Sequence, residues 1–292
     1  FEQRPTWGSG QTVHHRLTLN VLDKRDCRDL VREILQKVPE LSKAVRDLLV
    51  ERCEGNPFYL EELVKTLIDD RVILKETADV WRVEESRLSA LSLPSTLAGL
   101  LGARLDTLLY PEKLTLQRAA IIGRVFYDSA LKALDNDDDV HISGLHTVLG
   151  TLTQRGFIAQ RETTAFAGSI EYTFSSGLVR DALLTALLRR QITGYHRATA
   201  DWLTRTVGER ADEYALPIAE HHEKAGALEK AGEVLLSAGT RARALDAYSQ
   251  AAALLERALL LLPDTAEAAR QEAAQVLSES YRMTGAYEIA LR

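Results

Sequence analysis

A glycine and a proline, in Gly55-Asn56-Pro57, stand directly before a segment with helical hydrophobic periodicity. Proline fixes its φ angle and has no N–H to donate, so it suits the first turn of a helix, while glycine permits a tight turn before it. Hydrophobic residues then recur at helical spacing and predict a buried face: Leu60, Leu63, Val64 and Leu67. The simplest interpretation is a well-started helix. A ligand contact at the helix N-terminus, where the dipole is positive, is the alternative.

Four further motifs follow this turn in a fixed order. They are Leu93-Pro94-Ser95-Thr96-Leu97, Ala103-Arg104-Leu105-Asp106, residues 119–126 and Glu171-Tyr172-Thr173-Phe174. Together with residues 55–63, their order and spacing resemble the region after the P-loop core in the signal-transduction ATPases with numerous domains (STAND ATPases), which are AAA-like NTPases. The pattern is most similar to that of large bacterial transcription activators and cyclase-linked ATPases.

The resemblance implies a nucleotide contact at the first turn of the helix. In that family the proline packs on the adenine ring, which assigns this role to Pro57, with Gly55 shaping the turn and Phe58 or Tyr59 lining the site. It also implies a parent protein that binds ATP or ADP with Mg²⁺ through an upstream P-loop domain of the same chain. The parent is then expected to be an ATPase.

The chemistry of ATP hydrolysis is missing from the chain itself. The sequence has no Gly-x-x-x-x-Gly-Lys-[Ser/Thr] motif, so no backbone amides and lysine are provided to surround β- and γ-phosphates. We therefore predict no catalytic residue and no bound cofactor or metal for this chain alone. Adjacent side chains on a helix point about 100° apart, so His221 and His222 do not form a natural metal-ligand pair.

Composition restricts the class of protein. The 292 residues are 46% hydrophobic and 27% charged, which is typical of globular proteins with two or three domains. No apolar run approaches the ~20 residues that cross a membrane. The two cysteines lack metal-ligand spacing and favour a reducing, cytoplasmic location. The chain starts at Phe1 and has a single methionine, Met283, so we interpret it as part of a longer protein.

The sequence predicts a mainly α-helical fold in four parts. Residues 1–22 are expected to be the end of the nucleotide-binding α/β core, with a short strand at 16–20. Residues 23–92 predict a helical lid domain, residues 93–190 a winged-helix domain with a small β-wing, and residues 191–292 helical repeats of the tetratricopeptide type.

Within these parts, the expected elements are set by hydrophobic periodicity and by turn residues. The lid is predicted to hold three helices and a hairpin of 72–74 with 81–83. The winged helix is predicted to hold helices 95–107, 111–123, 128–134 and 142–155, two wing strands at 156–160 and 170–174, and an outgoing helix at 179–190. In the last part, small residues indicate closely paired helices.

A winged helix raises the question of DNA binding. The segment 142–155 stands where a recognition helix would lie, but it offers only His146, Gln154 and Arg155 to DNA. The preceding acidic run, 135–139, is expected to be a solvated loop that repels phosphates. A packing role is therefore favoured. Relatives commonly have Arg-His where this chain has Ser175-Ser176, so no switching role of that histidine transfers to it.

These observations predict a regulatory or sensor fragment of a multidomain ATP-dependent signalling protein. Its helical repeats are expected to bind a protein partner or a small effector, or to form homo-oligomers. Two alternatives stay open at this stage. One is a transcription regulator whose winged helix binds DNA, and the other is a protein-interaction scaffold of tetratricopeptide type.

Overall fold

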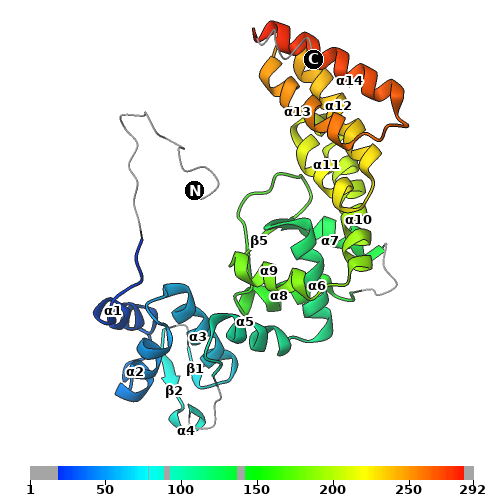
Figure 1. Ribbon diagram of the computed structural model, residues 1–292. Coiled ribbons are helices and arrows are strands. Elements are labelled where there is room, and N and C mark those ends of the chain that lie inside the picture. Colours follow the sequence, from blue (N-terminus) through cyan, green and yellow to red (C-terminus); the bar gives the residue numbers. More distant parts are fainter. Residues whose placement is uncertain (1–18, 78, 89–92, 137–141, 286–292) are drawn as a thin grey trace. The chain divides into compact units, whose positions relative to one another are not determined.

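Helices dominate the computed structural model, which describes residues 19–77, 79–88, 93–136 and 142–285 (Figure 1). This confirms the mainly helical fold. The chain forms two units, residues 1–104 and 105–292, and each is described by itself. Most of the strand expected at 16–20 lies outside the described residues, and Leu19 and Asn20 have no regular secondary structure. None of the helices in the described ranges is long and apolar enough to span a membrane.

The first unit is built on helices α1 (Lys24–Ile34), α2 (Lys43–Arg52) and α3 (Pro57–Asp69), as predicted. Each begins at a polar cap. The side chains of Asp23, Ser42 and Asn56 accept hydrogen bonds from N–H groups of the first turn, and each such cap typically stabilises a helix by about 1 kcal/mol. The three helices share one hydrophobic core, which includes Val31, Val45, Leu49, Leu60 and Leu63.

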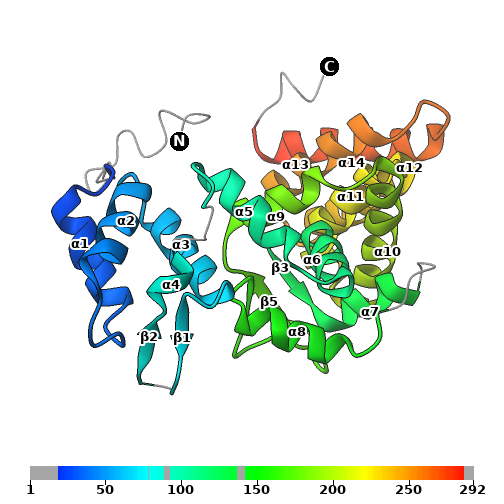
Figure 2. The same cartoon turned by 90° about the horizontal axis from the view of Figure 1, so that it is seen from below.

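The expected hairpin packs beside these helices (Figure 2). Strands β1 (Ile73–Lys75) and β2 (Trp81–Val83) are antiparallel, with Ile73 opposite Val83. A short helix, α4 (Glu85–Leu88), follows. Helix α5 (Leu97–Asp106) then sends Leu100 into the same core, so its first part belongs to this unit.

The second unit opens with a small sheet and the helices around it. These are α6 (Tyr110–Ile122), β3 (Val125–Tyr127), α7 (Asp128–Asn136), α8 (Leu145–Gln154), β4 (Ile158–Gln160) and β5 (Glu171–Phe174). The strands are antiparallel in the order β3-β5-β4, so β4 and β5 pair as expected. Strand β3 was not predicted from the sequence. Its Phe126 is fully buried against the rings of Tyr172 and Phe174, which makes the strand part of the core.

Two predicted helices have different bounds. Helix α8 begins at Leu145 rather than at 142, because Gly144 before it has a left-handed backbone (φ +69°). The single helix expected at 179–190 is two helices, α9 (Gly177–Thr185) and α10 (Arg189–Val207). The second helix starts where the Gln191 side chain accepts a hydrogen bond from the Leu188 N–H at 3.2 Å. No glycine or proline marks this break.

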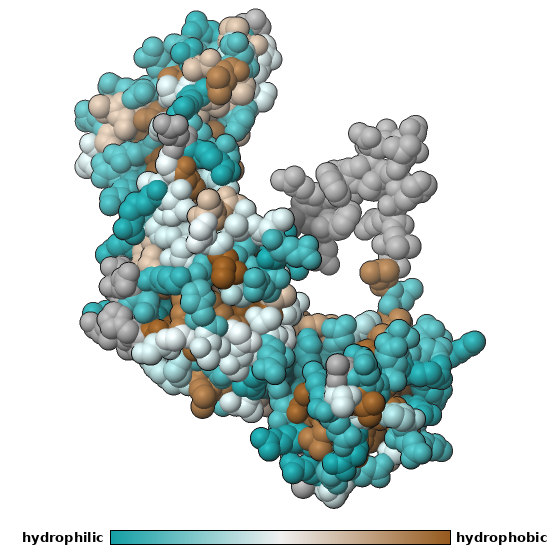
Figure 3. Space-filling model, turned by 180° about the vertical axis from the view of Figure 1, so that it is seen from behind, coloured by the Kyte–Doolittle hydropathy of each residue, from teal (hydrophilic) through white to brown (hydrophobic). Residues whose placement is uncertain are grey.

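The rest of the chain is a row of helices, each packed on the next (Figures 1 and 2). After α10 come a 3₁₀ segment (Gly208–Tyr214), α11 (Ala215–Lys224), α12 (Leu228–Ala244), α13 (Tyr248–Leu261) and α14 (Glu267–Met283). On the face shown in Figure 3, hydrophilic side chains separate the few exposed hydrophobic ones of these helices. Most of their apolar side chains form a buried core between the helices, although Leu245 and Leu260 are exposed.

Two glycines let α12 and α13 approach closely. A Cβ at Gly232 would lie 2.6 Å from Cγ of Leu262, and one at Gly239 would lie 2.7 Å from Cγ of Leu255. Each glycine thus forms a notch that a leucine of the neighbouring segment fills. Small residues therefore let the two segments approach at both positions.

Replacing Gly239 by alanine should therefore destabilise the protein, although alanine is the better helix former. We expect a loss of about 1–3 kcal/mol in the free energy of unfolding from overpacking. Gly194 in α10 is the matched control, because nothing lies within 4 Å of its added Cβ. Gly194→Ala should raise stability by roughly 0.5–1 kcal/mol. Urea unfolding of both variants measures the difference, and equal effects would contradict the notch.

Candidate functional site

The turn before α3 is fixed by a close backbone contact. Gly55 has φ +77°, a left-handed conformation, and a Cβ at this position would lie 2.5 Å from the carbonyl oxygen of Leu22. The Leu22 N–H in turn donates to the Gly55 carbonyl at 2.8 Å. Only glycine satisfies both the backbone conformation and the available space. The sequence-based role of Gly55 in shaping the turn agrees with this geometry.

Pro57 is the first residue of α3 and is exposed, while Phe58 is half-buried beside it. The side chain of Asn56 accepts hydrogen bonds from the N–H groups of Phe58 (3.0 Å) and Tyr59 (3.2 Å). These are donors that a phosphate group at a helix N-terminus would otherwise use. The turn therefore presents an apolar proline ring rather than free amides, which suits the flat face of an aromatic base.

Tyr59 faces the other way. Only 3% of it is exposed, and its hydroxyl donates to the carbonyl oxygen of Pro94 at 3.2 Å. The structure thus places Gly55, Pro57 and Phe58 along one turn and holds Tyr59 in the core. Through Tyr59, the Gly-x-Pro motif contacts the Leu93–Leu97 motif, which lies 35 residues further along the chain.

A buried charge cluster joins α3 to α5. The carboxylate of Glu62 pairs with the guanidinium of Arg104, and the two residues are 1% and 2% exposed. Arg104 also contacts Asp69 at 3.3 Å, and Lys65 contacts Glu62 at 2.7 Å. One further sequence motif, residues 103–106, is therefore connected in space to residues 55–63. A buried ion pair of this kind is stable only while both partners are present, because each desolvated charge depends on the other.

Two thiols lie beneath the same turn. The Sγ atoms of Cys27 in α1 and Cys53 after α2 are 3.6 Å apart, and both cysteines are buried and reduced. Burial raises the pKa of Cys27 to about 11, and the neighbouring Cys53 adds to the shift. Such thiols are poorly reactive. Their role is to fill the hydrophobic core of the first unit, and no spacing or motif in the sequence indicates that they lie close together.

The comparisons with known proteins are sparse. No family model matches the chain. The chain is 27% identical over 267 residues to an uncharacterized protein of Rhizobium meliloti (strain 1021), and the alignment covers 90% of the chain. It covers 24% of that protein, so the chain spans about a quarter of the length of the relative it matches.

Helix α8 offers few groups to a nucleic acid. His146 has a side chain that is 60% exposed, and Gln154 is exposed at the other end of the helix. The guanidinium of Arg155, by contrast, donates to Thr107 at 2.7 Å and pairs with Glu112 at 3.5 Å. It is turned back onto the protein. The sequence of α8 itself holds neither lysine nor arginine.

The start of the acidic run is not a solvated loop, contrary to expectation. Asp135 lies in α7, and its carboxylate pairs with the fully buried Arg118 at 2.6 Å and accepts the Ile142 N–H at 2.8 Å. A buried arginine requires a counter-charge, and Asp135 provides it. Residues 137–139 lie outside the described residues.

A histidine pair lies between α10 and α11. The Nδ1 atoms of His196 and His221 are 2.8 Å apart, so one ring donates a hydrogen bond and the other accepts it. Burial lowers the pKa of His196 to about 3, with His221 and Lys224 adding to the shift. Burial likewise lowers the pKa of His221 to about 4. His222 is buried too. The described residues hold no group of three or more His, Cys, Asp or Glu side chains that could bind a metal ion.

Removing Arg104 should strongly destabilise the first unit. Arg104→Met leaves the buried Glu62 carboxylate with only Lys65, and we expect a loss of about 3–5 kcal/mol in the free energy of unfolding. Adding Glu62→Leu should recover most of the loss, because a hydrophobic pair replaces the orphaned charge. The control is Arg32→Met, since the Arg32–Asp29 pair is exposed and such pairs contribute about 0–1 kcal/mol. A double variant as unstable as Arg104→Met would contradict the pairing.

The histidine pair should make stability depend on pH. Because the folded-state pKa values of His196 and His221 lie below the ordinary value of 6.5, the unfolded chain takes up protons first as pH falls. The stability contributed by the neutral pair is therefore present above pH ~6.5 and is lost below it, at up to about 1.4 kcal/mol per pH unit for each proton.

Denaturant unfolding between pH 7 and pH 5 measures this slope. His196→Gln should flatten it by up to one proton, and the exposed His146→Gln should leave it as in the unmodified protein. Identical slopes in all three proteins would show that the pair does not stay neutral in the folded state.

Proposed function

We propose that this chain is a regulatory segment of a multidomain, ATP-dependent signalling protein of the STAND type. Helices α1–α5 act as a lid whose α3 turn contacts adenine, the following unit is a winged helix that packs rather than reads DNA, and the C-terminal helices bind a partner or effector. The chain contributes to nucleotide binding but supplies no hydrolytic group.

One observation carries the proposal: the Gly55-Asn56-Pro57 turn is rigid and ends in an exposed proline ring. The contact between Gly55 and Leu22 fixes the turn, and Asn56 occupies the amides of the helix N-terminus. A surface of this kind fits the face of a purine and offers little to phosphates. In the parent, an upstream P-loop domain of the same chain would bind the phosphates and Mg²⁺.

The order of elements in the second unit supports the winged-helix assignment. A helix, a strand, two helices and two strands follow one another as α6, β3, α7, α8, β4 and β5, with the sheet order β3-β5-β4. The lack of lysine and arginine in α8 and the inward position of Arg155 favour a packing role, because phosphate contacts from cations supply most DNA affinity. Ser176, at the position of the family's histidine, caps α9 instead.

The row of helices α11–α14 supports a repeat module. Consecutive helices pack pairwise, and Gly232 and Gly239 bring α12 and α13 close, as helical repeats of the tetratricopeptide type require. Stacked helix pairs provide long surfaces for a protein partner, a small effector or a second copy of the chain. The length of the Rhizobium relative, of which this chain covers 24%, supports a larger multidomain parent.

Pro57→Ala tests the adenine contact in the full-length protein with its P-loop domain. Loss of the ring removes about 1 kcal/mol of apolar contact, so the Kd for ATP should rise roughly fivefold to tenfold. Pro39→Ala is the control, because Pro39 is also exposed and lies in the same unit. Isothermal titration measures both variants, and thermal melts establish that they are folded. Equal ATP affinity in Pro57→Ala and the unmodified protein would remove Pro57 from the site.

A further inference from the structure

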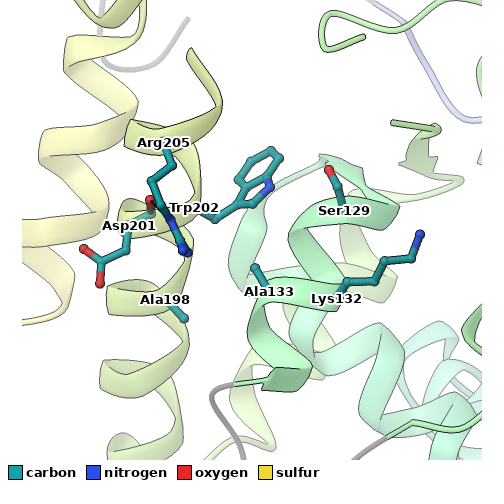
Figure 4. A pocket seen from close by; sticks show the side chains of 7 residues that line it. All are labelled: Ser129, Lys132, Ala133, Ala198, Asp201, Trp202 and Arg205. Carbon is teal, nitrogen blue, oxygen red and sulfur yellow. Dashed lines mark hydrogen bonds between the residues drawn. The ribbon is translucent and has the colours of Figure 1, made fainter. Parts of the chain in front are cut away.

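A cavity of about 530 Å³ lies between α7 and α10 in the second unit (Figure 4). Its wall on α7 is formed by Ser129, Lys132 and Ala133, which share one helix face because they are three and four residues apart. The opposite wall is one face of α10, with Ala198, Trp202 and further residues described below. The volume falls within the range of small-molecule sites in proteins.

Small and large side chains together create this space. Ala133 and Ala198 leave room where larger residues would fill the gap between the helices. Trp202 extends from α10 toward α7 (Figure 4) and is held by the rings of Tyr127 and Phe166, at centroid distances of 5.6 and 5.5 Å. The wall of the cavity is thus rigid, and its shape does not depend on a loop.

The lining is rich in hydrogen-bond donors. Arg205 uses its Nε to donate to the carbonyl oxygen of Asp201 at 3.1 Å, and its two terminal nitrogens form no ion pair within the described residues. Lys132 contacts Asp128 at 2.8 Å and keeps further N–H donors, since its side chain is 51% exposed. The indole N–H of Trp202 has no hydrogen-bond partner in the described part of the chain.

The single carboxylate of the lining points elsewhere. In Figure 4 the Asp201 carboxylate lies on the side of α10 away from α7, while Arg205 lies alongside Trp202. On that side Asp201 acts on His222 of α11. Burial lowers the pKa of His222, and the negative charge of Asp201 partly opposes this shift.

The Lys132 ammonium is paired with Asp128 and extends on the side of α7 away from α10 (Figure 4), and the Ser129 hydroxyl shares a hydrogen bond of 2.6 Å with that of Ser169. Among the lining side chains, the guanidinium of Arg205 and the indole N–H of Trp202 therefore supply the positive charge and the neutral donor that face the space between α7 and α10. This arrangement selects against a cationic ligand.

We propose that the cavity binds a small organic anion. Arg205 would hold a carboxylate or phosphate group through its planar pair of nitrogens, and Trp202 would contact the body of the ligand. The proposal that an anion binds here depends only on the geometry of the cavity. Its use as the effector site of the C-terminal helices rests on the proposed signalling function.

The test follows the indole N–H resonances of the chain by ¹⁵N–¹H NMR, with the Trp202 signal assigned by Trp202→Phe. The probes are succinate and inorganic phosphate, which separate carboxylate from phosphate recognition, with sodium chloride at matched ionic strength as the blank. We expect a saturable shift of the Trp202 signal by at least one anion, with a Kd in the range of about 1–10 mM for such small probes. No saturable shift with either anion overturns the proposal.

Variants then locate the binding. Arg205→Gln should raise the Kd about tenfold, because it removes a charge-assisted contact. Lys132→Gln should change the Kd less than twofold, because the Lys132 ammonium extends away from α10 (Figure 4). Arg197→Gln is the matched control, since Arg197 is an exposed cation of the same helix that does not line the cavity. It should change the Kd less than twofold. An equal rise of the Kd in all three variants would mean that anions are attracted diffusely to a basic surface, and it would overturn the proposed site. If Arg205→Gln is not folded, Arg205→Lys, which keeps the charge and loses the planar pair of nitrogens, is compared with Arg197→Lys and decides alone.

This experiment uses no nucleotide and no P-loop domain. Its failure therefore leaves the adenine contact at Pro57 untouched, and failure of that contact leaves the anion site untouched.

Discussion

The close approach of Gly55 to the Leu22 carbonyl is the constraint on which the first unit depends. It requires Gly55, in the turn between α2 and α3, to keep its left-handed conformation, and this sets the direction in which α3 begins. Since the φ angle of Pro57 is fixed and Asn56 closes the first turn with its side chain, three consecutive residues restrict the conformation of the turn. A rigid turn can present a ring to a ligand without paying conformational entropy on binding. The proposed adenine contact depends on this rigidity.

Behind the turn, the α3 helix is held by charges rather than by apolar packing alone. Glu62 and Arg104 are desolvated together, and their attraction is strong only because no water competes. The pair ties the middle of α3 to α5, while Tyr59 ties its first turn to Pro94. A shift of either contact would move the proline ring. The motifs 55–63, 93–97 and 103–106, which are separate along the sequence, are therefore parts of one mechanical unit.

Local features were predictable from the sequence, and contacts between distant residues were not. The caps Asp23 and Ser42, the N1 proline and the hairpin of 73–75 with 81–83 all follow from residues within one turn of each element. Strand β3 was missed because three residues between two helices carry no alternating pattern. The break before α10 was missed because a Gln191 side chain, not a glycine or proline, makes it.

The candidate site divides in the same way. Gly55 and Pro57 could be singled out because their backbone preferences are properties of single residues. The burial of Tyr59 depends on a carbonyl group 35 residues away, and the Arg118–Asp135 and His196–His221 pairs depend on how helices meet. In a sequence, an aspartate that neutralises a buried arginine is indistinguishable from one in a solvated run. Only the packing of the second unit separates the two.

Small residues illustrate why packing decides. In α12, the side chains of Leu262 and Leu255 occupy the space beside Gly232 and Gly239, so the lack of a side chain there allows close contact. Between α7 and α10, Ala133 and Ala198 border a cavity, so a small side chain means empty space. The difference lies in Trp202, whose ring is held by Tyr127 and Phe166 and stands between the two helices. A rigid aromatic side chain that keeps helices apart, next to residues too short to fill the gap, creates a pocket with fixed walls. Arg205 then gives that pocket its charge, and a ligand need not reorganise the helices to enter it.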